Sequence, residues 1–232
     1  MDNTYNNRKK LIKKAESLAK KYHKGQVDKA GKEYFLHPQY VSEHVLGYKG
    51  KIVGYLHDIL EDTDCTEEKL RSEFDDDIVA AVLALTRRNG EDYTDFILRV
   101  KQNAIATSVK AADIIHNSMI ERLNNPSEKD YQRLKKYRRA LSLLGYEDYD
   151  RTERYPCKCC GNYTLDEPPE GSFEICEVCG WEDDDLQSEF IHLTGGANCN
   201  SLYIARKNYI KYGASHKGDG FLYRKPFPFE IK

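Results

Sequence analysis

The dipeptide His57-Asp58 lies within residues 52–62, a run whose first part is apolar. A second histidine, His37, stands alone upstream, and Asp113 lies in the apolar segment 109–115. Acidic side chains rarely occupy apolar helices unless they are paired or bind a cation. Two imidazoles and two carboxylates in such settings therefore predict a metal site.

This mixed set of ligands indicates which ion and which chemistry to expect. Histidine with carboxylate suits Mn²⁺, Fe²⁺ or Mg²⁺ better than it suits a closed structural zinc site. Four protein ligands on an octahedral ion leave two positions, for a water molecule and a substrate phosphate oxygen, and the ion activates both. On a helix, Glu61 and Asp62 lie four residues beyond His57 and Asp58, so they face the same spot. The pattern predicts a metal-dependent phosphohydrolase.

Each residue taken singly also has an ordinary structural role open to it. His37 precedes a proline, as a residue at a helix start does, and Asp113 could be a buried carboxylate satisfied by a neighbouring lysine. A lone His-Asp dipeptide occurs by chance. The order of the residues along the chain, each on an expected helix, favours the metal site. We expect His116 to support the fold or the site, and His44 to lie on the surface.

Five of the seven cysteines form a second cluster, within residues 157–179. Cys157 and Cys160 make one CxxC turn, and Cys176 and Cys179 make another after 15 intervening residues. Two such turns place four thiolates around one tetrahedral Zn²⁺, which leaves no open position for catalysis. Cys159 has no place in this set, although it could exchange roles with Cys160. The alternative is a group of buried or redox-active thiols; Cys199 is expected in a core.

Composition limits the remaining possibilities. The chain has 232 residues, 40% hydrophobic and 32% charged, with a net charge of −2, which is typical of a globular protein. No apolar run approaches the roughly 20 residues that span a bilayer, and the N-terminus lacks a secretory signal, so we expect no membrane partner. The clustered, odd-numbered cysteines favour a reducing compartment, the cytoplasm. The near-neutral charge, with acids at 183–185, does not favour nucleic acid as a partner.

Periodicity predicts how the elements carry these residues. Helical spacing recurs over residues 11–22, 51–61, 75–86, 93–100, 105–120 and 129–144, with another helix beginning at Thr66. Nothing in this part alternates as a strand does, so residues 1–148 are predicted to be an all-α domain. A polar linker is expected over residues 146–154. Residues 153–232 are predicted to be a small α+β zinc-binding domain with one helix over 201–212.

Residues 22–26, 31–38, 56–63 and 109–117 carry a resemblance to a known family. They look like the hydrolase domain of the bifunctional RelA/SpoT proteins, and are similar to the small stand-alone hydrolases of guanosine tetraphosphate, over about residues 8–145. The resemblance implies an all-helical HD fold whose reaction removes pyrophosphate from the ribose 3′ position. It implies Mn²⁺ held by His37, His57, Asp58 and Asp113. It also implies that Glu61 and Asp62 orient and deprotonate the attacking water.

The resemblance further implies substrate contacts at Asn117 and at the pair Arg133 and Tyr137, although the pair also fits an ordinary helix face. One position departs from the family: Asp28 stands where an arginine often packs on the guanine, and an acid cannot supply that contact. Lys29 is the candidate to compensate. The leading hypothesis is a hydrolase of nucleotide polyphosphates, with guanosine 3′,5′-bis(diphosphate) as first candidate. A nucleotidase or phosphatase acting on another nucleotide is the alternative.

Residues 155–161, 165–169, 174–183 and 195–202 resemble the cysteine-rich CPCC domains, which are zinc-ribbon-like modules of unknown function. Lys158 stands where the name-giving motif has proline. The resemblance implies a structural module or one that contacts a protein partner. A further alternative for the whole chain is therefore a non-catalytic nucleotide sensor with a zinc-ribbon interaction domain. The expected fold is mainly α, an all-helical HD domain followed by a small zinc-ribbon-like α+β domain.

Overall fold

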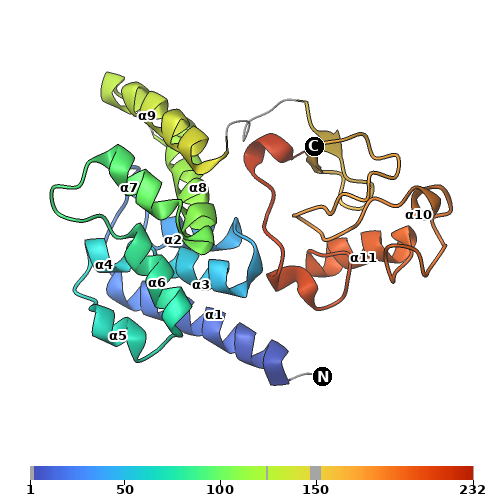
Figure 1. The fold of residues 1–232 in the computed structure, drawn as a ribbon, viewed down its shortest axis with the longest axis horizontal. Helices are drawn as coiled ribbons and strands as arrows, with labels where there is room; N and C mark the ends of the chain where they lie inside the picture. The colour runs from blue at the N-terminus through green and yellow to red at the C-terminus, as the bar shows by residue number, and fades with distance from the viewer. Residues whose placement is uncertain (1–2, 124, 147–152, 232) are drawn as a thin grey trace. The chain divides into compact units, whose positions relative to one another are not determined.

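The computed structural model describes residues 3–123, 125–146 and 153–231. The chain divides into two compact units, residues 1–149 and 150–232 (Figure 1). The linker expected over residues 146–154 lies outside the described residues except at its two ends. The predicted domain limits of 1–148 and 153–232 therefore stay a prediction. We call the two parts the N-terminal and the C-terminal unit and describe each by itself.

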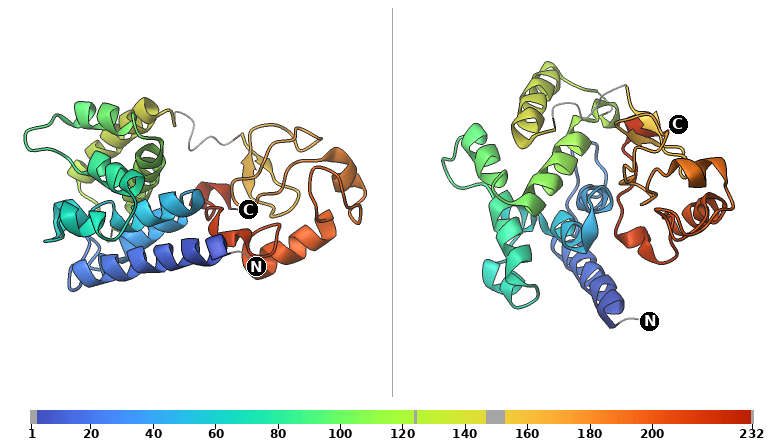
Figure 2. Two further views of the ribbon diagram at one scale, coloured as in Figure 1. Left: turned by 60° about the horizontal axis from the view of Figure 1, so that its bottom comes forward. Right: turned by 45° about the vertical axis from the view of Figure 1, so that its right-hand side comes forward.

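The described part of the N-terminal unit is helical. Its elements are α1 (Asn3–Tyr22), α2 (Leu36–Glu43), α3 (Gly47–Leu56), α4 (Ile59–Asp62), α5 (Glu67–Arg71), α6 (Asp76–Leu85), α7 (Tyr93–Val100), α8 (Ala104–Ser118), the 3-10 helix η1 (Ile120–Arg122) and α9 (Glu128–Leu144). Figure 2 shows α1 running alongside α3, which it contacts. The predicted helix over 93–100 matches α7 in both bounds.

Helix α8 is the centre of this unit. It contacts α2, α3, α6, α7 and α9 (Figure 1), and its side chains from Val109 to His116 are buried with one exception at Lys110, which is half-buried. Asn103 begins the helix, because its side-chain oxygen accepts a hydrogen bond from the Ala106 N–H at 3.0 Å. Asp113 is thereby carried on an apolar helix surrounded by other helices.

The helix predicted over residues 51–61 is wrong as a continuous element. The chain turns after α3, and α4 begins at Ile59 with Asp58 as its N-cap. The Asp58 carbonyl accepts hydrogen bonds from the N–H groups of Glu61 and Asp62. No glycine or proline marks this break in the sequence, so helical periodicity alone did not reveal it. The turn places His57 and Asp58 between two helices.

Gly54 allows α3 to cross α2 closely. A Cβ atom at Gly54 would lie 2.6 Å from the Ser42 Cα and 2.7 Å from the Ser42 N, closer than real Cβ contacts. Gly50, one turn earlier on α3, has more room: a Cβ there would meet Val45 side-chain atoms at 3.5 Å, an ordinary van der Waals distance. The two glycines therefore have different roles on one helix.

The C-terminal unit is built around cysteines. Strands β1 (Tyr155–Pro156) and β2 (Tyr163–Leu165) pair antiparallel, and they are followed by α10 (Asp185–Glu189), α11 (Leu202–Tyr212), and the 3-10 helices η2 (Asp219–Phe221) and η3 (Pro228–Glu230). The small core packs cysteines with Leu165, Val178, Trp181 and Leu202. The predicted fold class, mainly helical with a small cysteine-rich second part, is confirmed. Among the described helices, none combines the length and the apolar character that crossing a bilayer requires.

Replacing Gly54 by alanine should lower the free energy of unfolding by about 1–3 kcal/mol, because the new methyl group meets the α2 backbone and forces the helices apart. Gly50→Ala is the matched control, and it should raise stability by about 0.5–1 kcal/mol through helix propensity. Urea unfolding followed by circular dichroism measures both. Equal effects of the two substitutions would contradict the close crossing.

Candidate functional site

Four side chains predicted as metal ligands lie together in the N-terminal unit. His37 comes from α2, His57 and Asp58 from the turn after α3, and Asp113 from α8. His37 Nε2 lies 3.2 Å from His57 Nε2 and 3.2 Å from Asp113 Oδ1. Asp58 Oδ2 lies 2.9 Å from His57 Nε2 and 3.4 Å from His37 Nε2. One ligand atom from each of His37, His57 and Asp113 lies within 4.8 Å of the others, and Asp58 adjoins this group through the two imidazoles. The role of the four as ligands stays a prediction.

The hydrogen bonds behind the two imidazoles set their tautomers. His57 Nδ1 donates to the Gly54 carbonyl at 2.8 Å. Arg122 Nη1, which can only donate, lies 2.9 Å from His116 Nδ1, so that nitrogen is an acceptor, and His37 Nδ1, 2.7 Å from it, donates to the same lone pair. Both ligand rings therefore turn Nε2 toward the carboxylates. A bond to the other ring nitrogen orients metal-binding histidines in this way.

The electrostatics of this group favour a positive charge at its centre. Burial acts against a charged His37, but hydrogen bonds to Asp113 and Asp58 raise its pKa to about 9. Burial acts against an ionised Asp113, yet the charge of Lys110 and the hydrogen bond from His37 bring its pKa below the usual range. The protein thus holds a proton where two nitrogens and two carboxylates converge. This donor set fits a divalent cation, which would replace that proton.

Glu61 and Asp62 end the short helix α4 beside this group. The Glu61 carboxylate accepts a hydrogen bond from the backbone N–H of Arg87. Its pKa is raised, because partial desolvation and the carboxylates of Asp58 and Asp62 outweigh that hydrogen bond. The Tyr34 hydroxyl lies 2.7 Å from Asp58 Oδ2 and 2.8 Å from Asp62 Oδ2, so it donates to one of them at a time.

The segment that holds Glu61 is itself fixed by an ion pair. Arg99 Nε donates to Glu91 Oε1 at 2.7 Å and Arg99 Nη2 to Glu91 Oε2 at 2.8 Å. Glu91 Oε2 also accepts the backbone N–H of Arg88 at 3.0 Å. The hydrogen bonds from Arg99 and Arg88 lower the pKa of Glu91 to about 2. The pair therefore holds the loop whose Arg87 N–H reaches Glu61.

Two cavities of about 500 and 470 Å³ adjoin the predicted ligands. Both are lined by Asp58, Lys110, Asp113, Asn117, Arg133 and Tyr137. The larger also has Glu61, Arg87, Tyr93 and Lys136 in its wall, and the smaller has Lys29, Tyr34, His37 and Arg122. All four predicted substrate contacts, Lys29, Asn117, Arg133 and Tyr137, line the smaller cavity. Their contact with a substrate stays a prediction.

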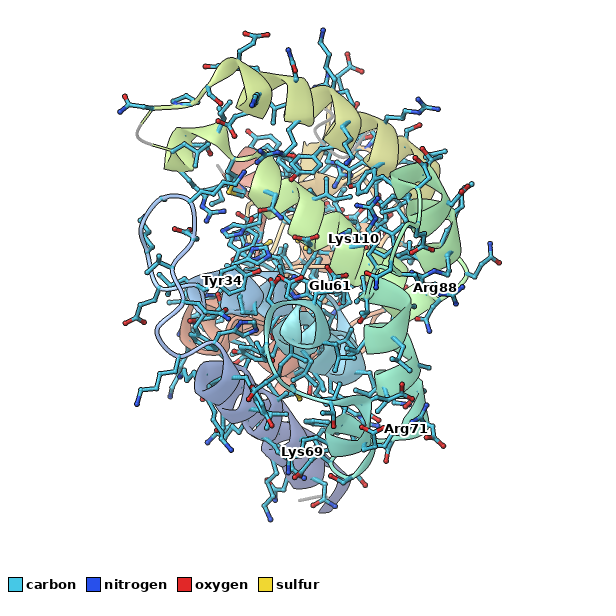
Figure 3. All side chains as sticks on the ribbon, turned by 90° about the vertical axis from the view of Figure 1, so that its left-hand side faces the viewer. Tyr34, Glu61, Lys69, Arg71, Arg88 and Lys110 are labelled. Atoms are coloured by element: carbon cyan, nitrogen blue, oxygen red, sulfur yellow. The ribbon has the colours of Figure 1, made fainter. Side chains whose placement is uncertain are left out.

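Sequence reasoning missed Lys110 and Tyr34 as site residues. Figure 3 shows Glu61 and Lys110 near each other at the middle of one face, with Tyr34 to one side. Lys110 Nζ lies 2.8 Å from Asp113 Oδ2, while Asp113 Oδ1 faces His37. The lysine that could have satisfied Asp113 is therefore present on one oxygen. The other oxygen, Oδ1, faces His37 and also accepts a hydrogen bond from Asn117 Nδ2 at 2.5 Å. The three-residue spacing on one helix was the available signal.

Two predictions about single residues are wrong. His44, expected on the surface, is buried, and its ring stacks on Tyr40 with the centroids 3.7 Å apart. Cys199, expected in a core, is exposed. His44 is adjacent to Val45 and Leu46, which fits its burial, whereas Cys199 lies between two asparagines, which fits its exposure.

The four cysteines of the CxxC turns lie together in the C-terminal unit. One ligand atom from each of Cys157, Cys160, Cys176 and Cys179 lies within 4.8 Å of the others. The Cys157–Cys179 and Cys160–Cys176 Sγ separations are 3.6 and 3.7 Å. Tetrahedral zinc with bonds of about 2.3 Å requires sulfur atoms about 3.8 Å apart. The cluster fits a metal ion, and Cys159 donates its N–H to Cys157 Sγ at 3.4 Å.

A glycine follows each CxxC turn and closes it. Gly161 donates its N–H to the Cys157 carbonyl at 2.8 Å, and Gly180 donates to the Cys176 carbonyl at 2.7 Å. Both glycines have positive φ, 79° and 72°, which side chains disfavour. The two turns are thus built alike, as expected when two knuckles hold one ion.

Comparisons with known proteins agree with both resemblances. Residues 155–230 match the family model described as cysteine-rich CPCC. This chain is 37% identical over 93 residues to a guanosine-3′,5′-bis(diphosphate) 3′-pyrophosphohydrolase of Borreliella burgdorferi, covering 38% of this chain and 14% of that protein. It is 31% identical over 123 residues to the protein of that name in Spiroplasma citri, covering 50% of this chain and 16% of the relative.

A relative with a different name and a solved structure complete the comparison. A Myxococcus xanthus GTP pyrophosphokinase is 30% identical over 142 residues, which cover 53% of this chain and 18% of that protein. A structure of a metazoan SpoT orthologue described as hydrolysing ppGpp has a TM-score of 0.51 at 21% identity, covering 58% of this chain and 85% of that one. The matches span less than a fifth of the curated relatives' length. The resemblance to SpoT-like hydrolases is confirmed, and the structure supports a shared fold.

Removing the metal from the cysteine cluster should unfold the C-terminal unit. Trp181, the one tryptophan of the chain, is buried in the core that contains these cysteines, so its fluorescence reports on that unit. We expect a red shift of its emission on chelation and in Cys176→Ser, because bound zinc contributes about 10–16 kcal/mol to such folds. Cys199→Ser, at an exposed cysteine, is the control. An unshifted emission after complete metal removal would show that the core stands without the ion.

The ion pair between Arg99 and Glu91, which holds the loop that contacts Glu61 through the Arg87 N–H, should weaken in acid. The folded-state pKa of Glu91, about 2, lies below its ordinary 4.5, so its stabilising contribution is complete above pH 4.5 and is lost as pH falls toward 2. Urea unfolding of wild type and Glu91→Gln should therefore show a stability difference that narrows over that window. A difference that stays constant from pH 6 to pH 2 would argue against the pair.

Proposed function

We propose that the N-terminal unit is an HD-type, Mn²⁺-dependent phosphohydrolase of nucleotide polyphosphates, with guanosine 3′,5′-bis(diphosphate) as the first candidate substrate. The observation that carries the proposal is the convergence of His37, His57, Asp58 and Asp113 beside two polar cavities. Asp58 and Asp113 line both cavities, and His37 lines the smaller one. Two of the relatives are named as hydrolases of this nucleotide, which supports the substrate class.

The four ligands would hold the ion. When bound, Mn²⁺ would lower the pKa of a water molecule and polarise the phosphoryl group. Glu61 lines the larger cavity, and its raised pKa makes it a better proton acceptor than an ordinary carboxylate, as a general base requires. Asp62 would help to orient the attacking water. The Tyr34 hydroxyl lies within hydrogen-bond distance of both Asp62 and Asp58 and so keeps the two carboxylates close together.

Basic side chains would bind the phosphates. Arg87, Lys110, Arg133 and Lys136 line the larger cavity. The charge of Asp113 helps to keep Lys110 protonated by raising its pKa against burial. Guanidinium and ammonium groups provide the charge-assisted hydrogen bonds that phosphates require. In this arrangement the phosphates extend past Glu61 and the nucleoside occupies the smaller cavity, beside Lys29, Asn117, Arg133 and Tyr137.

Asp28 keeps a second substrate class in consideration. Its carboxylate faces the smaller cavity and forms an ion pair with Arg122, at 2.7 Å, instead of offering a cation to a base. This observation favours a hydrolase that accepts another nucleotide as the alternative. The metal cluster and Glu61 would act in the same way on either substrate.

We also propose that the four cysteines bind a structural Zn²⁺, that the C-terminal unit contacts a protein partner, and that the protein works in the cytoplasm. Four thiolates close the coordination shell, which suits a structural ion. Exposed apolar side chains, among them Phe173, Ile175 and Phe190, suit contact with protein more than with nucleic acid. Cysteines placed to bind a metal suit a reducing compartment such as the cytoplasm.

Purified protein loaded with Mn²⁺ should release pyrophosphate from guanosine 3′,5′-bis(diphosphate). Glu61→Gln should retain the ion and lower kcat by about 10²- to 10⁴-fold, because it removes the base. Asp58→Ala should lose both the ion and the activity. Product release measured by ion-exchange chromatography, together with metal analysis, separates the two effects.

Arg71→Ala is the control, since Arg71 pairs with Glu67 and Asp76 on α5 and α6, away from Glu61 in Figure 3. A panel of other nucleotides tests the alternative substrates. If wild type and Asp58→Ala are equally inactive on the whole panel with Mn²⁺ bound to the wild type, the hydrolase proposal is wrong.

A further inference from the structure

The substitution that separates this chain from the family pattern, Asp28, has a definite structural role. Asp28 Oδ1 accepts the backbone N–H groups of Ala30 and Lys32, both at 2.9 Å, and so shapes the loop beside the smaller cavity. Asp28 Oδ2 accepts a hydrogen bond from Arg122 Nη2 at 2.7 Å. Burial acts against its ionisation, but the loop hydrogen bonds and Arg122 keep its pKa below the usual range.

Arg122 carries the contact onward toward the metal-ligand group. Its Nη1 donates to His116 Nδ1 at 2.9 Å and to the His116 carbonyl at 3.1 Å. Its Nη2 is the group bound by Asp28, so the planar guanidinium joins two acceptors from distant parts of the chain. The Asp28 and Arg122 side chains are 12% and 24% exposed, so solvent competes little for these bonds.

His116 passes the constraint to His37. Its ring lies near those of His37 and Tyr40, with centroid separations of 4.9 and 4.1 Å and angles of 16° and 20° between the planes. Because Arg122 only donates hydrogen bonds, His116 Nδ1 accepts, and the His37 Nδ1–H has one acceptor direction. That bond leaves His37 Nε2 aimed at Asp113.

We propose that Asp28 and Arg122 are positioning residues that act through His116 to fix the orientation and tautomer of His37. The pair connects the loop beside the substrate cavity to a predicted metal ligand, and it explains why an acid occupies position 28. The inference rests on the proposed role of His37 as a ligand, but it does not require that the protein hydrolyse any particular nucleotide. Outer hydrogen-bond partners of metal-binding histidines commonly have this effect on affinity.

A mutational cycle on Mn²⁺ affinity tests the chain of contacts. The probe is Mn²⁺ alone, added to the full chain, with the free ion measured by electron paramagnetic resonance. We expect Arg122→Ala to weaken Mn²⁺ binding by about 10- to 100-fold. His116→Phe keeps the ring stack but removes the acceptor, and should weaken binding to a similar extent. In the His116→Phe background, Arg122→Ala should have no further effect on affinity.

Two further measurements separate positioning from general stability. Urea unfolding of the metal-free variants gives the free energy of unfolding of each, and Mn²⁺ affinities are compared at a temperature where all of them are folded. Arg71→Ala, which removes another arginine from an ion pair, should leave Mn²⁺ affinity unchanged. If Arg122→Ala weakens Mn²⁺ binding equally in the wild-type and His116→Phe backgrounds, or not at all in wild type, the inference is overturned.

Asp28→Asn provides an independent arm should His116→Phe not fold. The asparagine oxygen can still accept from Ala30 and Lys32, but the charge that holds Arg122 is gone. We expect weaker Mn²⁺ binding and, for nucleotide hydrolysis, a loss of kcat that saturating Mn²⁺ restores. Unchanged Mn²⁺ affinity in Asp28→Asn would overturn the inference. If the variants weaken Mn²⁺ binding as expected but the wild-type protein cleaves no nucleotide, the proposed function is refuted and the inference is supported.

Discussion

Two carboxylates and two imidazole nitrogens face one another in the interior of the N-terminal unit, and such a group requires positive charge at its centre. Asp113 is almost fully buried, and burying an unpaired carboxylate is strongly unfavourable. The surrounding helices supply what the group needs from outside: Lys110 neutralises one oxygen of Asp113, and the Gly54 carbonyl orients His57. The arrangement of α2, α3 and α8 is therefore tied to the electrostatics of four side chains.

The C-terminal unit follows the same logic with softer ligands. Its core is small, and the four cysteines form much of it together with Trp181. The two turns that bring the sulfur atoms together are completed by Gly161 and Gly180, whose positive φ angles favour glycine. In both units, side chains that bring polar or charged atoms together are placed by short turns, while the longer helices supply apolar packing.

The sequence predicted the residue types of the site better than it predicted their connections. His37, His57, Asp58 and Asp113 were recognisable because imidazoles and carboxylates seldom occur together on apolar segments unless they bind a cation. The break in the helix at His57-Asp58 had no glycine or proline to signal it. Partners distant in sequence were inaccessible: Arg122 lies 94 residues from Asp28, and Tyr34 lies 28 residues from Asp62. Local patterns contain no information about which distant side chains meet across a fold.

The absent side chain of Gly54 has a consequence for the choice of ion. Gly54 lets α3 approach the α2 backbone at Ser42, and its carbonyl accepts the hydrogen bond from His57. His37 belongs to α2, and His57 is the residue after α3. The distance between the two imidazoles therefore depends on how closely these helices cross. The distance between the two imidazoles, and with it the ion radius that fits, thus depends on the backbone as much as on the ligands. Retuning this centre for a larger or smaller cation would begin at the crossing, with all four ligands left in place.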